Sequence, residues 1–228
     1  MKGDILMAKV FLSAGHGGSD PGACANGLTE KAINLQTLLK CKSELERHGV
    51  TVIASRVKDE NDPVQEEVRE ANASGADIAV SFHANAGGGD GFEAFYWTGS
   101  AAGKKLAQLC EKHVKALGQN SRGCKTNNLM FTRETTMTAV LVESFFVDNK
   151  TDMKIGDTVA EWNAFGTAYA KAILEYLGIT YKANTTTTSK PATTGKLYRV
   201  QVGAYSKKEN AEAMQKKLKA AGYDAIIV

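Results

Sequence analysis

Two histidines and two glutamates stand where α/β proteins present reactive side chains. His16 and His83 each follow a short apolar run and precede glycines, and Glu30 opens an amphipathic segment. Glu143 lies inside the apolar run 139–147, where a carboxylate is rarely placed unless it is paired, faces a cleft or approaches a metal. Taken alone, Glu143 is equally well explained as a strand-end glutamate that reaches solvent. The other three residues favour chemistry.

These four residues have the composition of a metal-dependent hydrolytic site. Two imidazoles and one carboxylate are a ligand set of catalytic zinc, which keeps a fourth position open for water. Zinc lowers the pKa of that water to about 7 and polarises a carbonyl, and a separate base then takes the proton. His16, Glu30 and His83 are therefore candidate zinc ligands, and Glu143 is the candidate base. Because no His-Glu-x-x-His pair anchors the set, spacing alone leaves structural histidines as an alternative.

A largely parallel α/β sheet would gather these residues at one edge. Apolar runs that predict strands alternate with segments that predict helices, and open α/β sheets place their sites at the carboxyl ends of strands. We expect a mostly parallel twisted sheet covered by helices on both faces, followed by a small C-terminal β-α-β unit. Strands are predicted at 9–14, 50–56, 77–86, 91–97, 127–132 and 139–147, and helices at 29–48, 63–74, 101–117 and 159–177.

The segment around His16 and the helix after it carry further local signals. Glycines from Gly15 to Gly22 let the chain turn sharply after a strand, but neither Gly-x-Gly-x-x-Gly nor a P-loop lysine fits, which argues against nucleotide binding. Thr29 is the expected N-cap of the following helix. Its core-facing stripe is predicted at positions 32, 35, 38 and 39.

Composition limits the classes of partner and the location. The chain has 228 residues, 43% of them hydrophobic, which allows one good core, and its net charge of +3 is too small to argue for nucleic acid. No apolar stretch is long enough to insert in a membrane. The start of the chain lacks the apolar region of a secretory signal, so we expect synthesis in the cytoplasm and action elsewhere only after release. The four cysteines form no Cys-x-x-Cys pair and are expected to be free thiols.

The composition changes near the C-terminus. Residues 182–195 are rich in threonine and lack large apolar side chains, which predicts a flexible linker at 181–195. We therefore expect a catalytic domain at 8–180 and a separate β-α-β unit at 196–228. That unit contains about thirty residues, which is too few to bury a core alone.

Several linked motifs in residues 8–178 resemble the zinc-dependent N-acetylmuramoyl-L-alanine amidases of bacteria and their phages, of the amidase-3 type. The motifs are Gly15-His16-Gly17-Gly18-x-Asp20-Pro21-Gly22-Ala23, Gly27-Leu28-x-Glu30, Ala76-Asp77, Ser81-Phe82-His83-Ala84-Asn85 and Leu141-Val142-Glu143. The resemblance implies that His16, Glu30 and His83 hold zinc and that Glu143 is the catalytic glutamate. It also implies hydrolysis of the bond between N-acetylmuramic acid and L-alanine in bacterial peptidoglycan.

The resemblance leaves some features open. The family usually has Asp-Pro before Gly-His where this chain has Ser13-Ala14, a difference expected to affect support of the site more than ligation. Asn85 and Arg133 are candidate contacts of the substrate, although an exposed arginine is more often simply solvated. The same residues would serve a zinc peptidase or deacetylase acting on another amide, and a wall-binding protein with a dead site is a third interpretation. A phage endolysin and a host autolysin fit equally well.

The C-terminal unit resembles half of a SPOR-type peptidoglycan-binding module. The resemblance rests on the segment 198–205, the helix after it and the segment 222–225. Related amidases carry such halves in tandem, whereas this chain has one. We therefore hypothesise that the unit promotes homodimers.

Overall fold

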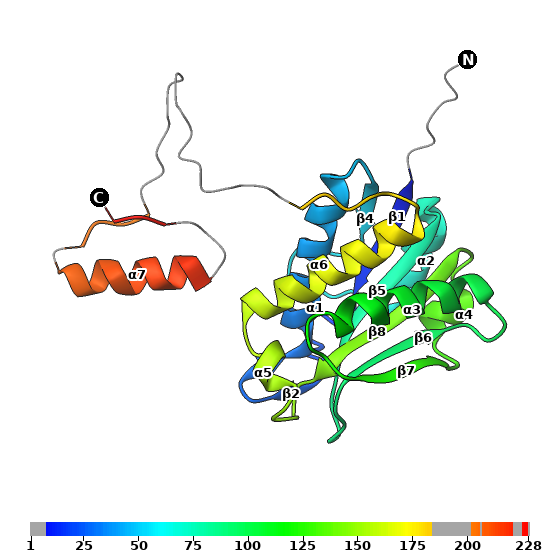
Figure 1. Cartoon of the computed structure of the whole chain (residues 1–228), viewed down its shortest axis with the longest axis horizontal. Helices are drawn as coiled ribbons and strands as arrows, with labels where there is room; N and C mark the ends of the chain where they lie inside the picture. The colour runs from blue at the N-terminus through cyan, green and yellow to red at the C-terminus, as the bar shows by residue number, and fades with distance from the viewer. Residues whose placement is uncertain (1–7, 184–201, 206, 221–224, 228) are drawn as a thin grey trace, which may run out of the picture. The chain divides into compact units, whose positions relative to one another are not determined.

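The computed structural model describes residues 8–183, 202–205, 207–220 and 225–227. The chain divides into two compact units, residues 1–181 and 182–228. In the first unit a six-stranded sheet is covered by helices on both faces (Figure 1). Its strands are β1 (Lys9–Ala14), β4 (Thr51–Ala54), β5 (Ile78–Asn85), β6 (Phe92–Tyr96), β7 (Ser121–Thr126) and β8 (Thr138–Phe146), with a separate pair β2 (Cys24–Ala25) and β3 (Leu28–Thr29). Its helices are α1 (Glu30–Glu46), α2 (Val64–Ser74), α3 (Ala101–Lys115), α4 (Met130–Glu134), α5 (Met153–Gly156) and α6 (Val159–Tyr176).

The sheet is mostly parallel, as predicted. Its strand order is β4-β1-β5-β8-β6-β7, and only the pairing of β6 with β8 is antiparallel. The connection between β5 and β6 spans residues 86–91, which is shorter than the dozen or more residues that a parallel crossover needs. For this reason β6 runs back against β8, and the first residues of β6 lie beside the carboxyl ends of β5 and β8.

The two faces of the sheet have different covers. Helices α1, α3 and α6 pack on one face over the larger apolar core, which includes Val80, Phe82, Val142 and Tyr169 (Figure 1). Helices α2 and α4 pack on the opposite face over a smaller core that includes Phe11 and Phe131. Because successive strand residues point to opposite faces, His83 and Glu143 share the second face with the smaller core.

Two local predictions were wrong. Residues 127–132 do not form a strand, because β7 ends at Thr126 and helix α4 begins at Met130. The apolar run there is only three residues long, and periodicity cannot distinguish a helix from a strand over so short a length. The core-facing stripe of α1 was also partly misplaced, since Leu38 is the one predicted position that is fully buried. The buried residues of α1 are Glu30, Ile33, Asn34, Thr37, Leu38, Cys41, Glu44 and Leu45.

The position of that stripe follows from the polar residues at the start of the helix. Glu30 and Asn34 are both buried and hydrogen-bonded to each other at 3.3 Å, with Asn34 also donating to the carbonyl of Gly15 at 3.0 Å. These bonds rotate α1 so that Ala32 is exposed and Leu35 is only half-buried. Thr29 does stand at the N-cap, but its side chain makes no capping hydrogen bond.

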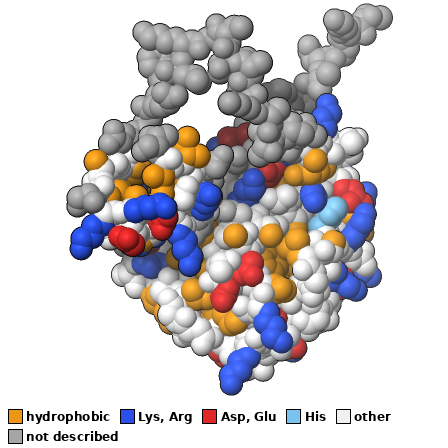
Figure 2. Space-filling view, turned by 60° about the vertical axis from the view of Figure 1, so that its left-hand side comes forward, with side chains coloured by type: hydrophobic (Ala, Val, Ile, Leu, Met, Phe, Trp, Pro, Cys, Tyr) orange, Lys and Arg blue, Asp and Glu red, His pale blue; other side chains and the backbone are white. Residues whose placement is uncertain are grey.

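The second unit contains helix α7 (Lys208–Ala220). The linker predicted at 181–195 falls largely outside the described residues and remains a prediction. Of the strands predicted around this helix, the described residues 202–205 and 225–227 are not in strands, and the other residues lie outside the described part of the chain. The four cysteines are free thiols, as expected, and Cys41 and Cys110 are fully buried. Among the described residues, no helix combines the length and apolar character that a membrane span requires. Lys, Arg, Asp and Glu side chains are interspersed on the face drawn in Figure 2.

Candidate metal centre and active site

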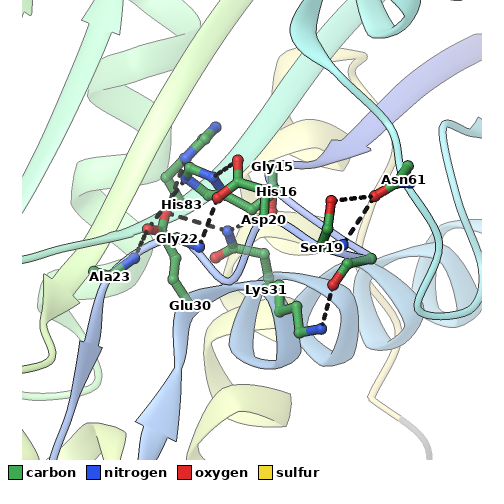
Figure 3. A network of polar contacts seen from close by, with 12 residues as sticks. Gly15, His16, Ser19, Asp20, Gly22, Ala23, Glu30, Lys31, Asn61 and His83 are labelled. Atoms are coloured by element: carbon green, nitrogen blue, oxygen red, sulfur yellow. Dashed lines mark hydrogen bonds and ion pairs between the residues drawn. The ribbon is translucent and has the colours of Figure 1, made fainter.

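The side chains of His16, Glu30 and His83 meet at the carboxyl ends of β1 and β5 (Figure 3). One nitrogen or oxygen atom of each lies within 4.8 Å of those of the other two. Within the described part of the chain, this is the one group of three or more such side chains close enough to share an ion. The structure therefore brings the three predicted ligands together, although their distances in sequence are 14 and 53 residues.

Glycines make room for this close approach. A Cβ atom on Gly15 would lie 2.1 Å from Cε1 of His83, so the ring of His83 packs directly on the backbone next to His16. A Cβ atom on Gly22 would lie 2.6 Å from a carboxylate oxygen of Glu30, and Gly22 also has a φ of +64°. His16 itself has a φ of +66°, a conformation that costs energy for a residue with a side chain. The glycine-rich loop is thus required by the geometry of the cluster.

Glu30 is the central residue of the cluster. One of its oxygens accepts hydrogen bonds from His83 Nδ1 at 2.9 Å and from the N–H of Ala84 at 3.1 Å, and the other accepts from the N–H of Ala23 at 2.8 Å. Burial alone would raise the pKa of this carboxyl, but the hydrogen bonds from His16 and His83 outweigh that effect and hold the pKa well below its usual range. Glu30 is therefore an ionised, buried carboxylate suited to a cation.

Both imidazoles favour a positive charge beside Glu30. The hydrogen bond to Glu30 raises the pKa of His16 to about 9, against the lowering effect of burial. Burial also lowers the pKa of His83, but the hydrogen bond to Glu30 leaves that pKa raised overall. The two rings lie edge to face with centroids 5.2 Å apart. A metal ion would take the place of the protons that these rings share with the carboxylate.

Asp20 orients the first of these rings. Its Oδ2 lies 2.8 Å from Nδ1 of His16, while Nε2 of His16 lies 3.2 Å from Glu30 (Figure 3). Ligand histidines in metal sites commonly bond a carboxylate through the nitrogen that does not face the metal. Sequence reasoning quoted Asp20 only within the glycine-rich motif and gave it no role. Its spacing, four residues after His16 within a tight turn, was the available signal.

Glu143 stands beside the cluster on the neighbouring strand. It pairs in register with His83 across β5 and β8, so both side chains leave the same face of the sheet. Its Oε2 is buried and has no hydrogen-bond partner among the described residues. Burial raises the pKa of this carboxyl to about 7. A half-buried carboxyl with a pKa near neutrality and an unused oxygen has the properties of a proton acceptor.

The two residues suggested as substrate contacts have different surroundings. Asn85 lies at the end of β5, two residues after His83, and its amide donates to Glu93 at 3.2 Å. Arg133 is on α4, where its guanidinium binds Asn128 and Glu134, both at 2.6 Å. Substrate contact by either residue remains a prediction. Ser13 and Ala14, which replace the usual Asp-Pro, are fully buried beneath the site.

A buried arginine that sequence reasoning did not single out joins the segments that carry the ligands. Arg56 is only 2% exposed, and its guanidinium donates to the carbonyls of Ala14 at 2.9 Å, Gly15 at 3.4 Å and Lys31 at 2.8 Å. Gly15 precedes His16, and Lys31 follows Glu30. Arg56 therefore connects the loop after β1 with the start of α1 and fixes the separation of two candidate ligands.

Replacing Arg56 by methionine should weaken zinc binding by about 10-fold to 100-fold, as loss of a residue that supports ligands typically does. The carbonyls left without a donor should also lower the melting temperature. Zinc affinity measured by competition with a chromogenic chelator, well below the melting temperature, separates the two effects. Arg69→Met, at an exposed arginine of α2 paired with Glu66, is the matched control. Unchanged zinc affinity in Arg56→Met would show that Arg56 serves the fold alone.

Comparison with known proteins identifies the first unit. The N-acetylmuramoyl-L-alanine amidase family model matches residues 10–175, and the SPOR domain model matches residues 166–228. The second match begins inside α6, which is buried in the core of the first unit, so residues 182–228 hold only part of it. The expected resemblance of the tail to a SPOR module is confirmed, and its completeness is left open.

Relatives and solved structures agree with the family match. The N-acetylmuramoyl-L-alanine amidase CwlM of Bacillus licheniformis is 36% identical over 226 residues, covering 97% of this chain and 85% of that protein. The endolysin of Bacillus phage SPP1 is 38% identical over 183 residues, covering 76% of this chain and 68% of that protein. The catalytic domain of the amidase CwlV from Bacillus (Paenibacillus) polymyxa var. colistinus superposes with a TM-score of 0.71 at 31% identity, covering 76% of this chain and 100% of that one. This chain belongs to the N-acetylmuramoyl-L-alanine amidase family.

Proposed function

We propose that this amidase cleaves the bond between the lactyl group of N-acetylmuramic acid and L-alanine of the stem peptide with the help of a zinc ion held by His16, Glu30 and His83. The proposal of a bound metal rests on the cluster of His16, Glu30 and His83, whose donor atoms lie within 4.8 Å of one another. Two imidazoles and a carboxylate are a donor set that suits catalytic zinc. The low pKa of Glu30 and the support of His16 by Asp20 favour a divalent cation at this point.

The residues around the cluster supply the remaining steps of hydrolysis. Zinc, when bound, would lower the pKa of a water molecule and polarise the scissile carbonyl. Glu143 accepts the proton from the attacking water, since its carboxyl stands beside His83 and has an oxygen without a partner among the described residues. Glu143 then donates this proton to the nitrogen of L-alanine as the amide bond breaks. The burial of its Oε2 keeps bulk water from competing for the proton.

The two rival interpretations are less well supported. A wall-binding protein with a dead site has no need of the buried cluster or of Glu143, and all four residues are in place. A zinc peptidase or deacetylase would use the same residues, but the family match favours the amidase. Similar proteins include both bacterial amidases and a phage endolysin, so lysis and autolysis are both compatible settings.

Mass spectrometry of digested peptidoglycan tests the proposal. Purified sacculi are incubated with the wild-type protein, with the chelator-treated protein and with the chelator-treated protein reloaded with zinc. We expect stem peptides that begin at L-alanine from the wild-type and reloaded samples only. Cleavage at another bond would overturn the substrate, and undiminished cleavage after complete metal removal would overturn the metal.

The C-terminal unit is expected to bring two chains together on the wall. Among its described residues none is buried, and Val202 and Ile226 are 60% and 77% exposed, which is consistent with a module that needs a second half. Light scattering of the full chain and of residues 1–182 tests this expectation. A dimer that becomes a monomer on truncation would support it, whereas monomers in both cases would contradict it.

A further inference from the structure

A second polar cluster lies next to Glu143 and has no part in the hydrolysis described above. Glu143 pairs in register with His83 on β5 at one side and with Glu93 on β6 at the other. Residues paired across neighbouring strands point to the same face of a sheet. His83, Glu143 and Glu93 therefore form one row across three adjacent strands, which begins at the candidate metal centre and leads toward the sheet edge at β7.

Glu93 binds two positively charged side chains of the edge strand β7. Its Oε1 accepts from Arg122 Nε at 2.8 Å and from Lys125 Nζ at 2.5 Å, and its Oε2 accepts from the amide of Asn85 at 3.2 Å. Burial alone would raise the pKa of Glu93, but the hydrogen bonds from Lys125 and Arg122 leave that pKa lowered. The carboxylate is thus ionised. The side chains of Glu93, Arg122 and Lys125 together carry a net charge of +1, and the carboxylate of Asp90 lies within electrostatic range of Arg122.

The side chains of Arg122 and Lys125 remain accessible to solvent, although the carboxylate of Glu93 that binds them is buried. The side chains of Arg122 and Lys125 are 43% and 42% exposed, against 8% for Glu93. Hydrogen bonds with the described residues take one of the five N–H donors of Arg122 and one of the three donors of Lys125. The guanidinium of Arg122 also lies over the ring of Phe146 at 5.3 Å, which restricts its position. Both cations are therefore fixed in place with donors to spare.

A purely structural role explains this arrangement less well. Neutralising one buried carboxylate requires one cation, whereas Glu93 pairs with two, Arg122 and Lys125. Positively charged side chains that are fixed in position and have free N–H donors commonly bind carboxylates. Guanidinium groups match the geometry of a carboxylate particularly well. Glu93 stands one strand away from Glu143, and the two cations that it binds are on the next strand, β7.

We propose that Arg122 and Lys125 form a subsite for a carboxylate of the stem peptide, close to the amide bond that is cleaved. This inference rests on the proposed function, because it assumes that the scissile amide lies at His83 and Glu143. Glu93 is a positioning residue that holds the two cations, and Arg122 and Lys125 contact the substrate. The enzyme should therefore prefer stem peptides in which the residue after L-alanine carries a free carboxylate over those in which it is amidated.

The test compares two muropeptides that differ only in whether the residue after L-alanine carries a free carboxylate or a carboxamide. Single variants Arg122→Met and Lys125→Met are suitable, because each leaves one cation on Glu93 and avoids an unpaired buried carboxylate. Since a charge-assisted hydrogen bond is lost, we expect kcat/KM for the carboxylate substrate to fall by about 10-fold, mainly through KM. For the carboxamide substrate kcat/KM should change little. Lys112→Met, at an exposed lysine of α3, controls for the general loss of a positive charge.

The possible results distinguish a failure of the subsite proposal from a failure of the proposed function. Equal kcat/KM of the wild type for both muropeptides, or an equal loss for both substrates in the variants, would overturn the subsite and leave the amidase intact. Failure of the zinc-loaded wild type to cleave either muropeptide or sacculi would overturn the proposed function and the subsite with it. Melting temperatures within a few degrees of the wild type are expected for both variants, since both side chains are largely at the surface.

Discussion

Replacing Glu143 by glutamine is expected to lower kcat for peptidoglycan hydrolysis by about 100-fold to 10,000-fold, the usual contribution of a positioned general base. Glutamine has nearly the same shape but cannot accept the proton of the attacking water. The residue stands beside the metal cluster and not within it, so the variant should still bind one zinc ion per chain. Release of stem peptides gives the rate, and elemental analysis gives the zinc content.

The same substitution has a consequence for stability in the metal-free protein. Burial raises the pKa of Glu143 from 4.5 to about 7, so the carboxyl binds its proton more tightly in the folded chain than in the unfolded one. Its contribution to stability is fully present below pH 4.5 and is lost as the pH rises through 7. At pH 8 the metal-free Glu143→Gln variant should therefore be more stable than the metal-free wild type by on the order of 3 kcal/mol. The difference should disappear near pH 4.

Glu175→Gln is the matched control for both measurements, because this exposed glutamate belongs to α6, which packs on the face of the sheet opposite to that of Glu143. It should keep the wild-type kcat and show no gain in stability at pH 8. Hydrolysis by Glu143→Gln at half the wild-type rate or more would contradict the role of Glu143 as the base. Loss of zinc from that variant would instead assign Glu143 to the metal.

Removal of a ligand is expected to abolish both zinc binding and activity. His83→Ala leaves His16 and Glu30, and two protein ligands are fewer than the three of catalytic zinc sites. We expect less than stoichiometric zinc after dialysis and hydrolysis at background level. Zinc should also raise the melting temperature of the wild type and not that of the variant, since a ligand that binds the folded chain stabilises it by about 4 kcal/mol at a thousand times its Kd.

His113→Ala provides the control for this experiment. His113 lies on α3, where it binds Glu175 at 2.7 Å, in agreement with a structural role. This variant should keep one zinc ion per chain and the wild-type rate. One tightly bound zinc ion per chain in His83→Ala would contradict the proposed ligand set, and full activity of a metal-free wild type would contradict zinc dependence itself.

Three of the four candidate site residues, His16, His83 and Glu143, were noticeable because each stands out from its local pattern. Histidines that end apolar strands, and a glutamate inside the run 139–147, are unusual enough to be noticed without a structure. The same apolar runs also predicted the mostly parallel sheet, since buried strands and amphipathic helices have distinct periods. That sheet brings the carboxyl ends of β1, β5 and β8 to one edge, and with them His16, His83 and Glu143.

Other features depended on contacts between distant segments. The rotation of α1 follows from hydrogen bonds of Glu30 and Asn34 to groups outside the helix, which no pattern within the helix contains. Helix α4 replaced a predicted strand because three apolar residues have no measurable period. The antiparallel course of β6 followed from a short connection, but only the pairing with β8 placed Glu93 beside Glu143.

The sequence by itself therefore determined the class of fold and predicted the candidate ligands and the candidate base, because these depend on residue types, on linked motifs and on periods within single elements. The tertiary structure alone decided how the site is supported, through Asp20 on His16, Arg56 between two ligand-bearing segments, and Glu93 with its two cations. Each of these is a charged residue of ordinary appearance in the sequence. Its role comes from the partner that folding places within hydrogen-bond distance, and that distance is set by the packing of the whole sheet.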